Sequence, residues 1–527
     1  MGRKRQPAKI ETDDGSVIYT DLEIAVEEAD QVRHLRLRTQ TRDGLPAAIS
    51  ALKNLEHLDV SKNSFAAFPG AQPDEPDATL RILAAARSCI SDVTEELGRF
   101  TGLERLDLSW NEFSTLPAEI GELGRLKTLR IEKTPLQNLP REIGDIAELK
   151  FLELDGCQLR ELPDSIGSLS RLRRLDLTGN NLIKLPESMG GASRLRVLLL
   201  GGNELRSLPV SLGALSQLVE LDLGNNSLAE LPDDISGWSR LQRLSLAGNT
   251  ELDVGEVLAA ITALPELKRL EMSHLSLTRE HKLPTGLREL IWRHGAGERL
   301  PEQLFDLSEL ETIDLAFGAI EELSAQLGAL HELRRLDLTA NAIRELPKQV
   351  GELSKLETLR IGSNQLSALP ASMGKLQHLR RLDASFNKLR GLPAALGNSS
   401  SLRELNLENN AIAELDEILP ALEKLPELKR VKMVGNPITL DADACRKLRQ
   451  LHPECRWELE PGKALHRIFH EARRQLAVGE SDEARQKLES IAEFDPDDFS
   501  DEPMEFATHR ARSDARTMLD KLQGGRI

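Results

Sequence analysis

The segment LRRLDLTGNNLIKLPESMGGASR, residues 172–194, is followed without a gap by LRVLLLGGNELRSLPVSLGALSQ (195–217) and LVELDLGNNSLAELPDDISGWSR (218–240). All three share the frame L-x-x-L-x-L-x-x-N-x-L-x-x-L-P, and each returns after 23 residues. The frame can be laid from Val32 to about Leu440, which gives about eighteen units. A fixed period of this length indicates repeats that stack on their neighbours and need no single central core.

Each part of the frame has a physical reason. The alternating leucines are typical of a β-strand with one buried face, and the proline after them removes a donor that a continuing strand would need. The second half is therefore expected to return the chain as turns and short helix. The asparagine amide can bond the backbone groups of its own turn and of the neighbouring turn. The asparagines at this place are Asn63, Asn111, Asn180, Asn203, Asn226, Asn249, Asn341, Asn364, Asn387, Asn410 and Asn436.

These units resemble the leucine-rich-repeat family, and their length and their L-P-x-x-I-G-x-L half are similar to its intracellular, Ras-group-like and bacterial-type subclass. The resemblance covers about four fifths of the chain. It implies an α/β solenoid with a curved parallel β-sheet on the concave face and turns and short helices on the convex face. It also implies a protein partner on the concave face. A small GTPase as partner follows from the resemblance alone.

The ends differ from the repeats. Residues 1–31 are interpreted as an extension and a cap helix in which Thr20 and Glu23 form a capping box. Residues 32–440 hold the repeats, and 441–460 a C-terminal cap whose helix begins at Asp441. Residues 461–527 form a helical tail, with a hairpin that resembles a tetratricopeptide repeat without its Trp and Tyr and a third helix near 503–522. The tail is expected to pack on the solenoid, on a second copy or on a partner.

The composition limits the partners and the cellular location that we expect. The formal net charge is −17 and aromatic residues make up 3%, so nucleic acid is not an expected partner. We expect no membrane partner, because the chain has no apolar run of 18 residues and no signal peptide. Four cysteines favour a reducing, cytoplasmic location. Cys445 and Cys455 are expected to be reduced, and a redox-sensitive bond between them is the alternative.

The sequence contains none of the phosphate-loop, dinucleotide, nucleophile-elbow or H-E-x-x-H motifs. We therefore expect no enzyme activity, no cofactor and no metal, and we interpret the protein as a scaffold or adaptor. The alternative is a regulatory or effector protein, ubiquitin-ligase-like for example, with a minimal active tail. His274 and His294 could bind a metal ion, but we favour a role as exposed contact residues, since zinc needs further firm ligands. The oligomeric state stays open.

Many units read R-L-D-L, so the outward strand positions are expected to carry arginines and aspartates that pair with each other. Large apolar residues placed where charge is usual are candidate contact residues. They are Trp110, Phe151, Val197, Leu199, Ile291, Phe317 and Phe386.

The 23-residue period is interrupted near residues 267–309. One unit shrinks to 20 residues, and Leu275, Gly295 and Gly318 replace three consecutive asparagines. We expect the break to divide two regular arms, and Trp292 to point inward. The main partner-binding site is predicted around it, on His274, Ile291, Arg293, His294 and Phe317. The alternative is that one repeat simply lost residues and nothing depends on the loss.

Overall fold

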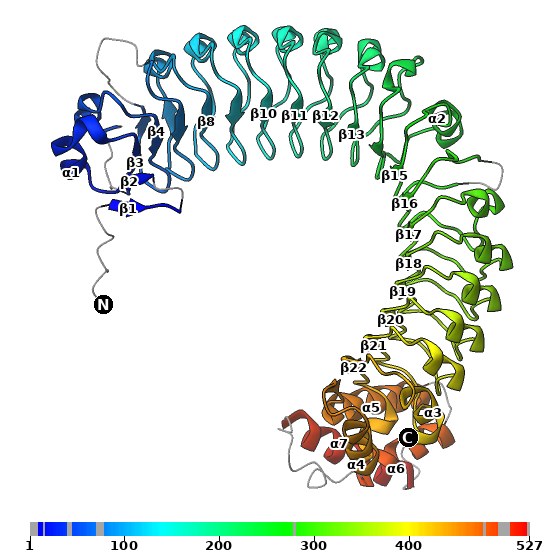
Figure 1. Ribbon diagram of the computed structural model, residues 1–527. Helices are drawn as coiled ribbons and strands as arrows, with labels where there is room; N and C mark the ends of the chain where they lie inside the picture. Colours follow the sequence, from blue (N-terminus) through cyan, green and yellow to red (C-terminus); the bar gives the residue numbers. More distant parts are fainter. Residues whose placement is uncertain are drawn as a thin grey trace. The chain divides into compact units, whose positions relative to one another are not determined.

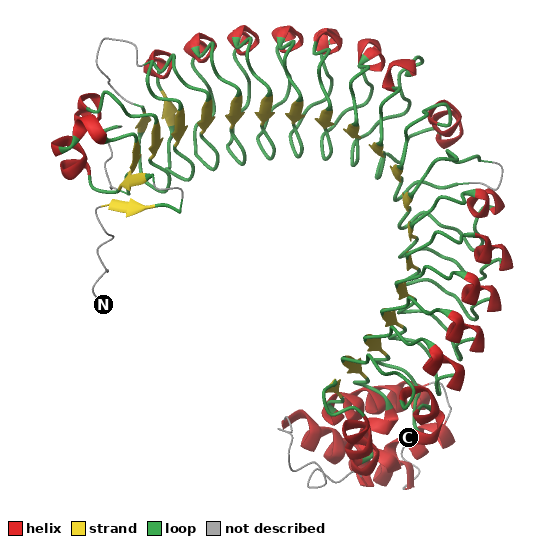
Figure 2. Cartoon of the chain, in the orientation of Figure 1, coloured by secondary structure: helices red, strands yellow, loops and turns green. Residues whose placement is uncertain are grey.

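The computed structural model describes residues 9–13, 16–38, 45–69, 78–277, 281–477, 481–493 and 506–523. The chain divides into two compact units, Met1–Leu275 and Ser276–Ile527. Within each unit short parallel strands line the inner side of an arc and short helices line the outer side (Figures 1 and 2). This is the predicted α/β leucine-rich-repeat solenoid, with a small helical tail at its C-terminal end.

The first unit contains the strands β1 (Lys9–Glu11), β2 (Val17–Tyr19), β3 (His34–Arg36), β4 (His57–Asp59), β5 (Ala67–Phe68), β6 (Ile82–Ala84), β7 (Asp92–Val93), β8 (Arg105–Asp107), β9 (Thr128–Arg130), β10 (Phe151–Glu153), β11 (Arg174–Asp176), β12 (Val197–Leu199), β13 (Glu220–Asp222), β14 (Arg243–Ser245) and β15 (Arg269–Glu271). Its α-helices are α1 (Leu22–Glu27) and α2 (Val254–Ile261). Its 3₁₀ helices are η1 (Ala29–Gln31), η2 (Ala47–Ala51), η3 (Glu95–Arg99), η4 (Ala118–Glu122), η5 (Arg141–Asp145), η6 (Asp164–Ser168), η7 (Glu187–Gly191), η8 (Val210–Ala214) and η9 (Ser236–Trp238).

The second unit contains the strands β16 (Glu289–Ile291), β17 (Thr312–Asp314), β18 (Arg335–Asp337), β19 (Thr358–Arg360), β20 (Arg381–Asp383), β21 (Glu404–Asn406), β22 (Arg430–Lys432) and β23 (Arg456–Glu458). Its 3₁₀ helices are η10 (Glu302–Asp306), η11 (Ala325–Ala329), η12 (Lys348–Glu352), η13 (Ala371–Lys375), η14 (Ala394–Asn398), η15 (Leu415–Glu417) and η16 (Pro437–Leu440). Its α-helices are α3 (Leu419–Leu422), α4 (Ala442–Leu451), α5 (Pro461–Ala477), α6 (Ser481–Glu493) and α7 (Phe506–Gln523).

The frame explains both surfaces. The strands pair in parallel with a register that places frame positions side by side, as in Leu152 opposite Leu175 and Leu175 opposite Leu198. These central leucines are fully buried, while the residues on either side of them face outward. A proline precedes most of the 3₁₀ helices, where its fixed φ suits the start of a helix and ends the strand-like path.

In the units that carry it, the asparagine side chain bonds to its own turn and to the turn of the preceding unit, as predicted, and we call these bonds the ladder. The Asn180 Nδ2 donates to the carbonyl oxygens of Leu154 in the preceding rung and Leu177 in its own rung, both at 2.9 Å. Its Oδ1 accepts from the backbone N–H of Leu159 at 3.0 Å. Where asparagine is missing, Cys157 keeps one of these bonds by donating from Sγ to the Ile131 carbonyl at 2.9 Å. The side chain at this position therefore ties each turn to the one before it.

The ladder gives a direct test. Asn180→Ala leaves two buried carbonyls and one N–H without their partner, so the unfolding free energy of the first unit should fall by about 1–3 kcal/mol. Asn181→Ala is the matched control, because Asn181 is exposed and its Nδ2 reaches only the Glu204 carboxylate. Urea unfolding followed by circular dichroism measures both, and equal stability of the two variants would refute the role of the ladder.

The N-terminal cap differs from the prediction. The helix cap is Asp21, not Thr20, because the Asp21 carboxylate accepts from the backbone N–H groups of Glu23 at 3.0 Å and Ile24 at 3.4 Å. Its backbone is extended, as an N-cap requires. The cap also contains an unpredicted antiparallel hairpin of β1 and β2, whose second strand pairs in parallel with β3. The hairpin thereby covers the edge of the first rung.

The boundary between the two compact units lies after Leu275, the first of the three consecutive residues that replace the turn asparagine around the short repeat. Leu275 is buried, so an apolar side chain fills the place of the amide. Trp292 is buried, as predicted from its inward position. The boundary between the two units therefore coincides with an interruption of the asparagine ladder.

The segment after the last repeat forms a helix and a strand. The Asp441 side chain caps α4 by accepting a hydrogen bond from the Ala444 N–H at 3.0 Å. Leu448 is one of the buried side chains of this helix. Strand β23 pairs in parallel with β22. Helix α5 then packs against η16, with Leu465, Phe469 and Ala472 among its buried side chains. Helices α5, α6 and α7 pack on one another, so the tail docks on the solenoid through α5.

One cation fixes this docking. The Arg467 Nη1 donates to the carbonyl oxygens of Asn410 at 3.1 Å and Gly435 at 2.9 Å, in the turns of the last two ordinary rungs. The tetratricopeptide resemblance of the α5–α6 hairpin stays a prediction.

Four cysteines are free thiols, of which Cys157, Cys445 and Cys455 are buried and Cys89 is exposed. Burial raises the pKa of each buried thiol to about 11, so these three remain protonated and unreactive near neutral pH.

Truncation tests whether the tail is part of the fold. Deleting the residues after Gly462 should leave both units folded, because α4 and β23 still close the last rung. The melting midpoint should fall by about 2–4 °C for each kcal/mol of lost docking. Arg467→Ala in the full chain is the control, since it removes the two bonds to the turn carbonyls and the pair with Glu471 but keeps the rest of the tail. Loss of the cooperative melting transition on truncation would show instead that the tail belongs to the cap.

Candidate protein-binding surface

The residue immediately before the ladder position adopts a left-handed conformation in nearly every rung. This region favours glycine, because a Cβ there approaches the following carbonyl oxygen. In the first unit the residues with positive φ at this position are Lys62, Arg87, Trp110, Lys133, Gly156, Gly179, Gly202, Asn225, Gly248 and His274. In the second unit they are His294, Phe317, Ala340, Ser363, Phe386, Asn409 and Gly435.

Five predicted contact residues occupy this left-handed position: Trp110, His274, His294, Phe317 and Phe386. Three of them, the tryptophan and the two phenylalanines, were expected among the strand residues; they lie in the turn after the strand instead, because the frame bends there to reach the ladder. Their exposed fractions are 47% for Trp110, 52% for Phe317 and 55% for Phe386. The fold therefore holds large apolar groups in solvent at a position that glycine would fill without strain.

Residues at this position stack on their neighbours in the next rung. The Arg87 guanidinium lies over the Trp110 ring, 4.4 Å from its centroid. The rings of His294 and Phe317 are nearly parallel, at 12°, with centroids 5.0 Å apart. The predicted column of His294 and Phe317 is thus confirmed within the second unit. His274 belongs to the first unit, and its place in the same column stays a prediction.

The other predicted apolar residues do lie on strands. Phe151 in β10 is 38% exposed, whereas Val197 and Leu199 in β12 and Ile291 in β16 are half-buried. Strand register places Arg174 of β11 between Phe151 and Val197. These side chains form two separate groups, one on β10–β12 and one beside the His294–Phe317 stack.

Arg293 is exposed, yet it is held by an ion pair. Its Nε lies 2.8 Å from the Asp314 Oδ2 on the next strand, and Nη2 donates to the same oxygen. A partner that contacts Arg293 therefore meets a guanidinium group whose orientation is already fixed by Asp314.

The pairing expected between the Arg and the Asp of an R-L-D-L strand is seen for Arg174 and Asp176, where Nη2 and Oδ2 are 2.8 Å apart. Asp337 instead meets Arg360 of the next rung at 3.3 Å, and Arg335 Nε donates to the Thr312 hydroxyl. Parallel register brings neighbouring rungs together, so cross-rung pairs replace the expected in-strand pairs.

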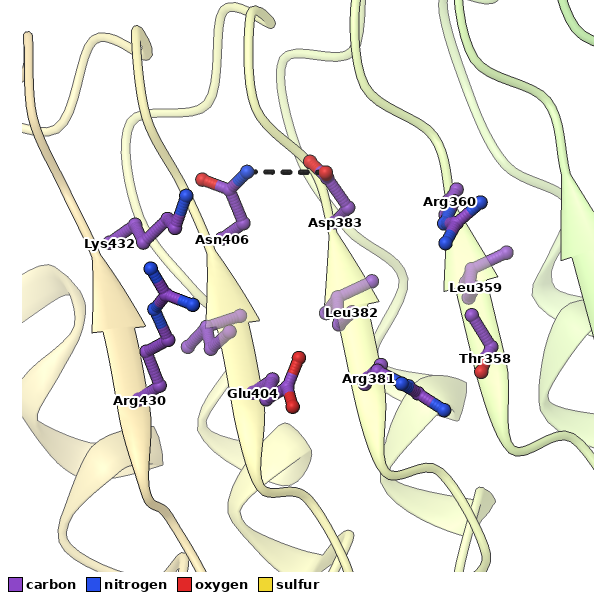
Figure 3. Close-up of a pocket in the computed structure, with 11 residues that line it drawn as sticks. Thr358, Leu359, Arg360, Arg381, Leu382, Asp383, Glu404, Asn406, Arg430 and Lys432 are labelled. Atoms are coloured by element: carbon purple, nitrogen blue, oxygen red, sulfur yellow. Dashed lines mark hydrogen bonds between the residues drawn. The ribbon is translucent and has the colours of Figure 1, made fainter. Parts of the chain in front are cut away.

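Two hollows on the strand face were not predicted. One, of about 470 Å³, lies over β6–β11 and is lined by Ile82, Ala84, Arg105, Phe151 and Arg174 among others. The second, of about 210 Å³, lies over β19–β22 (Figure 3). There Asn406 Nδ2 donates to the Asp383 Oδ2 at 3.1 Å, and the Arg430 guanidinium donates to Glu458. The sequence indicates which strand residues face outward at both places. It does not show that the surface they form is hollowed.

The described part of the chain holds no group of three or more His, Cys, Asp or Glu side chains arranged to bind a metal ion. Among the described helices, none combines the length and the apolar character needed to cross a membrane.

The fold defines the class of protein: the chain is a leucine-rich-repeat protein. Family comparison agrees, because a "Leucine-rich repeat region" matches residues 321–453, a "Leucine rich repeat" matches 147–205 and 193–250, and a third such repeat matches 102–123. Stacked repeats of this kind present extended concave surfaces that are used for protein interaction.

Among solved structures, a leucine-rich-repeat protein of Leptospira interrogans is 29% identical with a TM-score of 0.62, and the match covers 84% of this chain and 99% of that one. YopM from Yersinia enterocolitica is 24% identical with a TM-score of 0.48, covering 79% of this chain and 85% of that one. Lumican of Oryctolagus cuniculus is 38% identical over 82 residues, 15% of this chain. The chain spans 41% of lumican, less than half of that curated relative.

The left-handed conformation predicts that the difference in stability between a glycine and an alanine variant has opposite signs at Phe317 and at Phe151. At Phe317 the glycine variant should be more stable than the alanine variant by about 1 kcal/mol, because alanine keeps the left-handed cost. At Phe151, which lies in a strand, the glycine variant should be less stable than the alanine variant by about 0.5–1 kcal/mol. Chemical unfolding of the four variants measures both differences. The same sign at both positions would show that the turn imposes no strain.

Proposed function

We propose that the protein is a non-enzymatic scaffold or adaptor that binds a protein partner on the inner, strand-lined faces of its two units. The observation that supports this proposal most is the set of large apolar side chains kept in solvent there. Trp110, Phe317 and Phe386 stand at left-handed turns, where glycine would fold with less strain. Strain combined with exposure points to a role outside folding.

The main contact is proposed beside the short repeat, on Ile291, Arg293, His294 and Phe317 of the second unit, and His274 of the first unit is proposed separately as a contact residue. Aromatic rings and arginine are the groups that dominate binding energy at protein interfaces. The Arg293–Asp314 ion pair and the His294–Phe317 stack hold two of these groups in fixed positions before a partner arrives. Pre-organisation of this kind lowers the entropy that binding costs.

We also propose a cytoplasmic location and the Ras-group-like, bacterial-type subclass. The packing of Cys157, Cys445 and Cys455 as separate buried thiols supports a reducing compartment. All three are free thiols, so their packing does not depend on a disulfide bond.

The test is loss of binding by an apolar-to-serine double variant. A partner is first recovered from native lysate and identified by mass spectrometry. Ile291→Ser with Phe317→Ser should then weaken its binding at least tenfold, because full burial of each side chain contributes about 1.5–3 kcal/mol. Isothermal titration calorimetry measures the affinity.

Val210→Ser is the matched control, because Val210 is 68% exposed but lies in η8 rather than on a strand. It should bind like the wild type. Wild-type binding by the double variant, with binding lost in Trp110→Ser or Phe386→Ser, would move the contact away from the short repeat. Binding that survives every inner-face variant and fails with Val210→Ser would overturn the proposed surface.

A further inference from the structure

Three cations lie side by side at one edge of the inner face of the first unit. Lys150, Arg173 and Arg196 each precede a strand, and backbone bonds fix their adjacency. The Arg173 N–H donates to the Lys150 carbonyl and the Arg196 N–H to the Arg173 carbonyl, both at 2.8 Å. We call these three residues the basic edge. They are notable in a chain whose formal net charge is −17.

The carboxylates nearby are already neutralised. Asp155 lies 2.9 Å from the Lys133 Nζ, and Asp176 lies 2.8 Å from Arg174. Glu153 pairs with Arg130 and also faces Arg174. Within the described part of the chain, the side chains of the basic edge make no ion pair or hydrogen bond. The positive charge of the basic edge is therefore in excess.

Apolar side chains on β10 and β12 lie beside the basic edge. Phe151 of β10 follows Lys150 directly, and Val197 of β12 follows Arg196. Leu199 stands in β12 where the two preceding rungs carry Glu153 and Asp176 at the same register. The hollow of about 470 Å³ over β6–β11 reaches Phe151 and Arg174. Cations and apolar groups thus alternate across three rungs.

We infer that this patch binds an extended acidic polypeptide segment whose carboxylates meet the basic edge and whose apolar side chains cover Phe151, Val197 and Leu199. The inference rests on the proposed scaffold function and names the chemistry of one partner. Rungs are about 4.8 Å apart, so the basic edge spans roughly 10 Å, the length of about three residues of extended chain. Arginine guanidinium groups bind carboxylates through paired hydrogen bonds.

A polyphosphate chain fits less well. A continuous phosphate backbone carries a charge on every unit, which the net charge of −17 of the chain opposes, and it would leave Phe151, Val197 and Leu199 uncovered. A segment with isolated carboxylates and apolar residues between them avoids this repulsion.

The experiment is a selection of random dodecapeptides displayed on phage against the full-length protein, followed by fluorescence-anisotropy titration of the recovered peptides. Wild type should enrich Asp and Glu together with Leu, Phe or Trp. Arg173→Gln with Arg196→Gln should weaken binding of these peptides about tenfold, and Phe151→Ser should weaken it to a similar extent. Raising the salt concentration should reproduce the effect of the arginine double variant.

The matched control is Arg160→Gln with Arg206→Gln, which removes the same charge from exposed arginines that follow the ladder turn instead of preceding a strand. This control should bind like wild type. Equal weakening by both double variants would show a general charge effect and would overturn the inference.

Two other outcomes would also overturn it. Peptides that ignore the basic edge but require Ile291 and Phe317 would leave the scaffold function standing and remove the acidic-segment site. Tighter, Arg173-dependent binding of an oligothymidine probe, without acidic peptides in the selection, would assign the patch to phosphate instead. A selection that recovers no peptide above background would count against the scaffold function as well as the inference.

Discussion

The fold depends on one interaction, the bonds that the ladder side chain makes to carbonyl oxygens in two successive turns. Asn180 shows it completely, with one bond to its own rung and one to the rung before. A single rung cannot form this pattern alone, since half of its partners lie in its predecessor. Stacking is thus required by the polar groups of the turn as well as by the leucines. The leucines supply most of the buried area, while the amide fixes where each rung sits.

Much of the architecture could be predicted from the sequence, because periodic leucines, the ladder asparagine and the proline each impose a local geometry that repetition reinforces. The helix that Asp441 caps rests on a different, local signal, an N-cap residue at the start of a helical pattern. The β1–β2 hairpin could not be foreseen, since two strands of three residues carry no apolar period. Thr20 and Asp21 are both good N-cap residues, and only the backbone conformation decides between them.

The candidate surface was predicted less completely. Exposure of Trp110, Phe151, Phe317 and Phe386 followed from the frame, because any residue outside the leucine positions tends to face solvent. The left-handed conformation of Trp110, Phe317 and Phe386 was not predicted. The glycines at the same position of other units could have indicated it. Pairing of Arg293 with Asp314 depends on parallel register between rungs, which a search for charges within one strand misses.

The interrupted ladder at Leu275 has a consequence for how such a chain changes in evolution. Between Asn180 and Asn249 every rung offers its successor the same carbonyls and the same leucines, so a duplicated or deleted 23-residue unit leaves all contacts satisfied. Each arm can therefore change length by whole rungs without redesign. A rung built around Leu275, Gly295 or Gly318 has no such interchangeable neighbour. We therefore expect gain or loss of whole units in the regular stretches on either side of the irregular segment, and not within it.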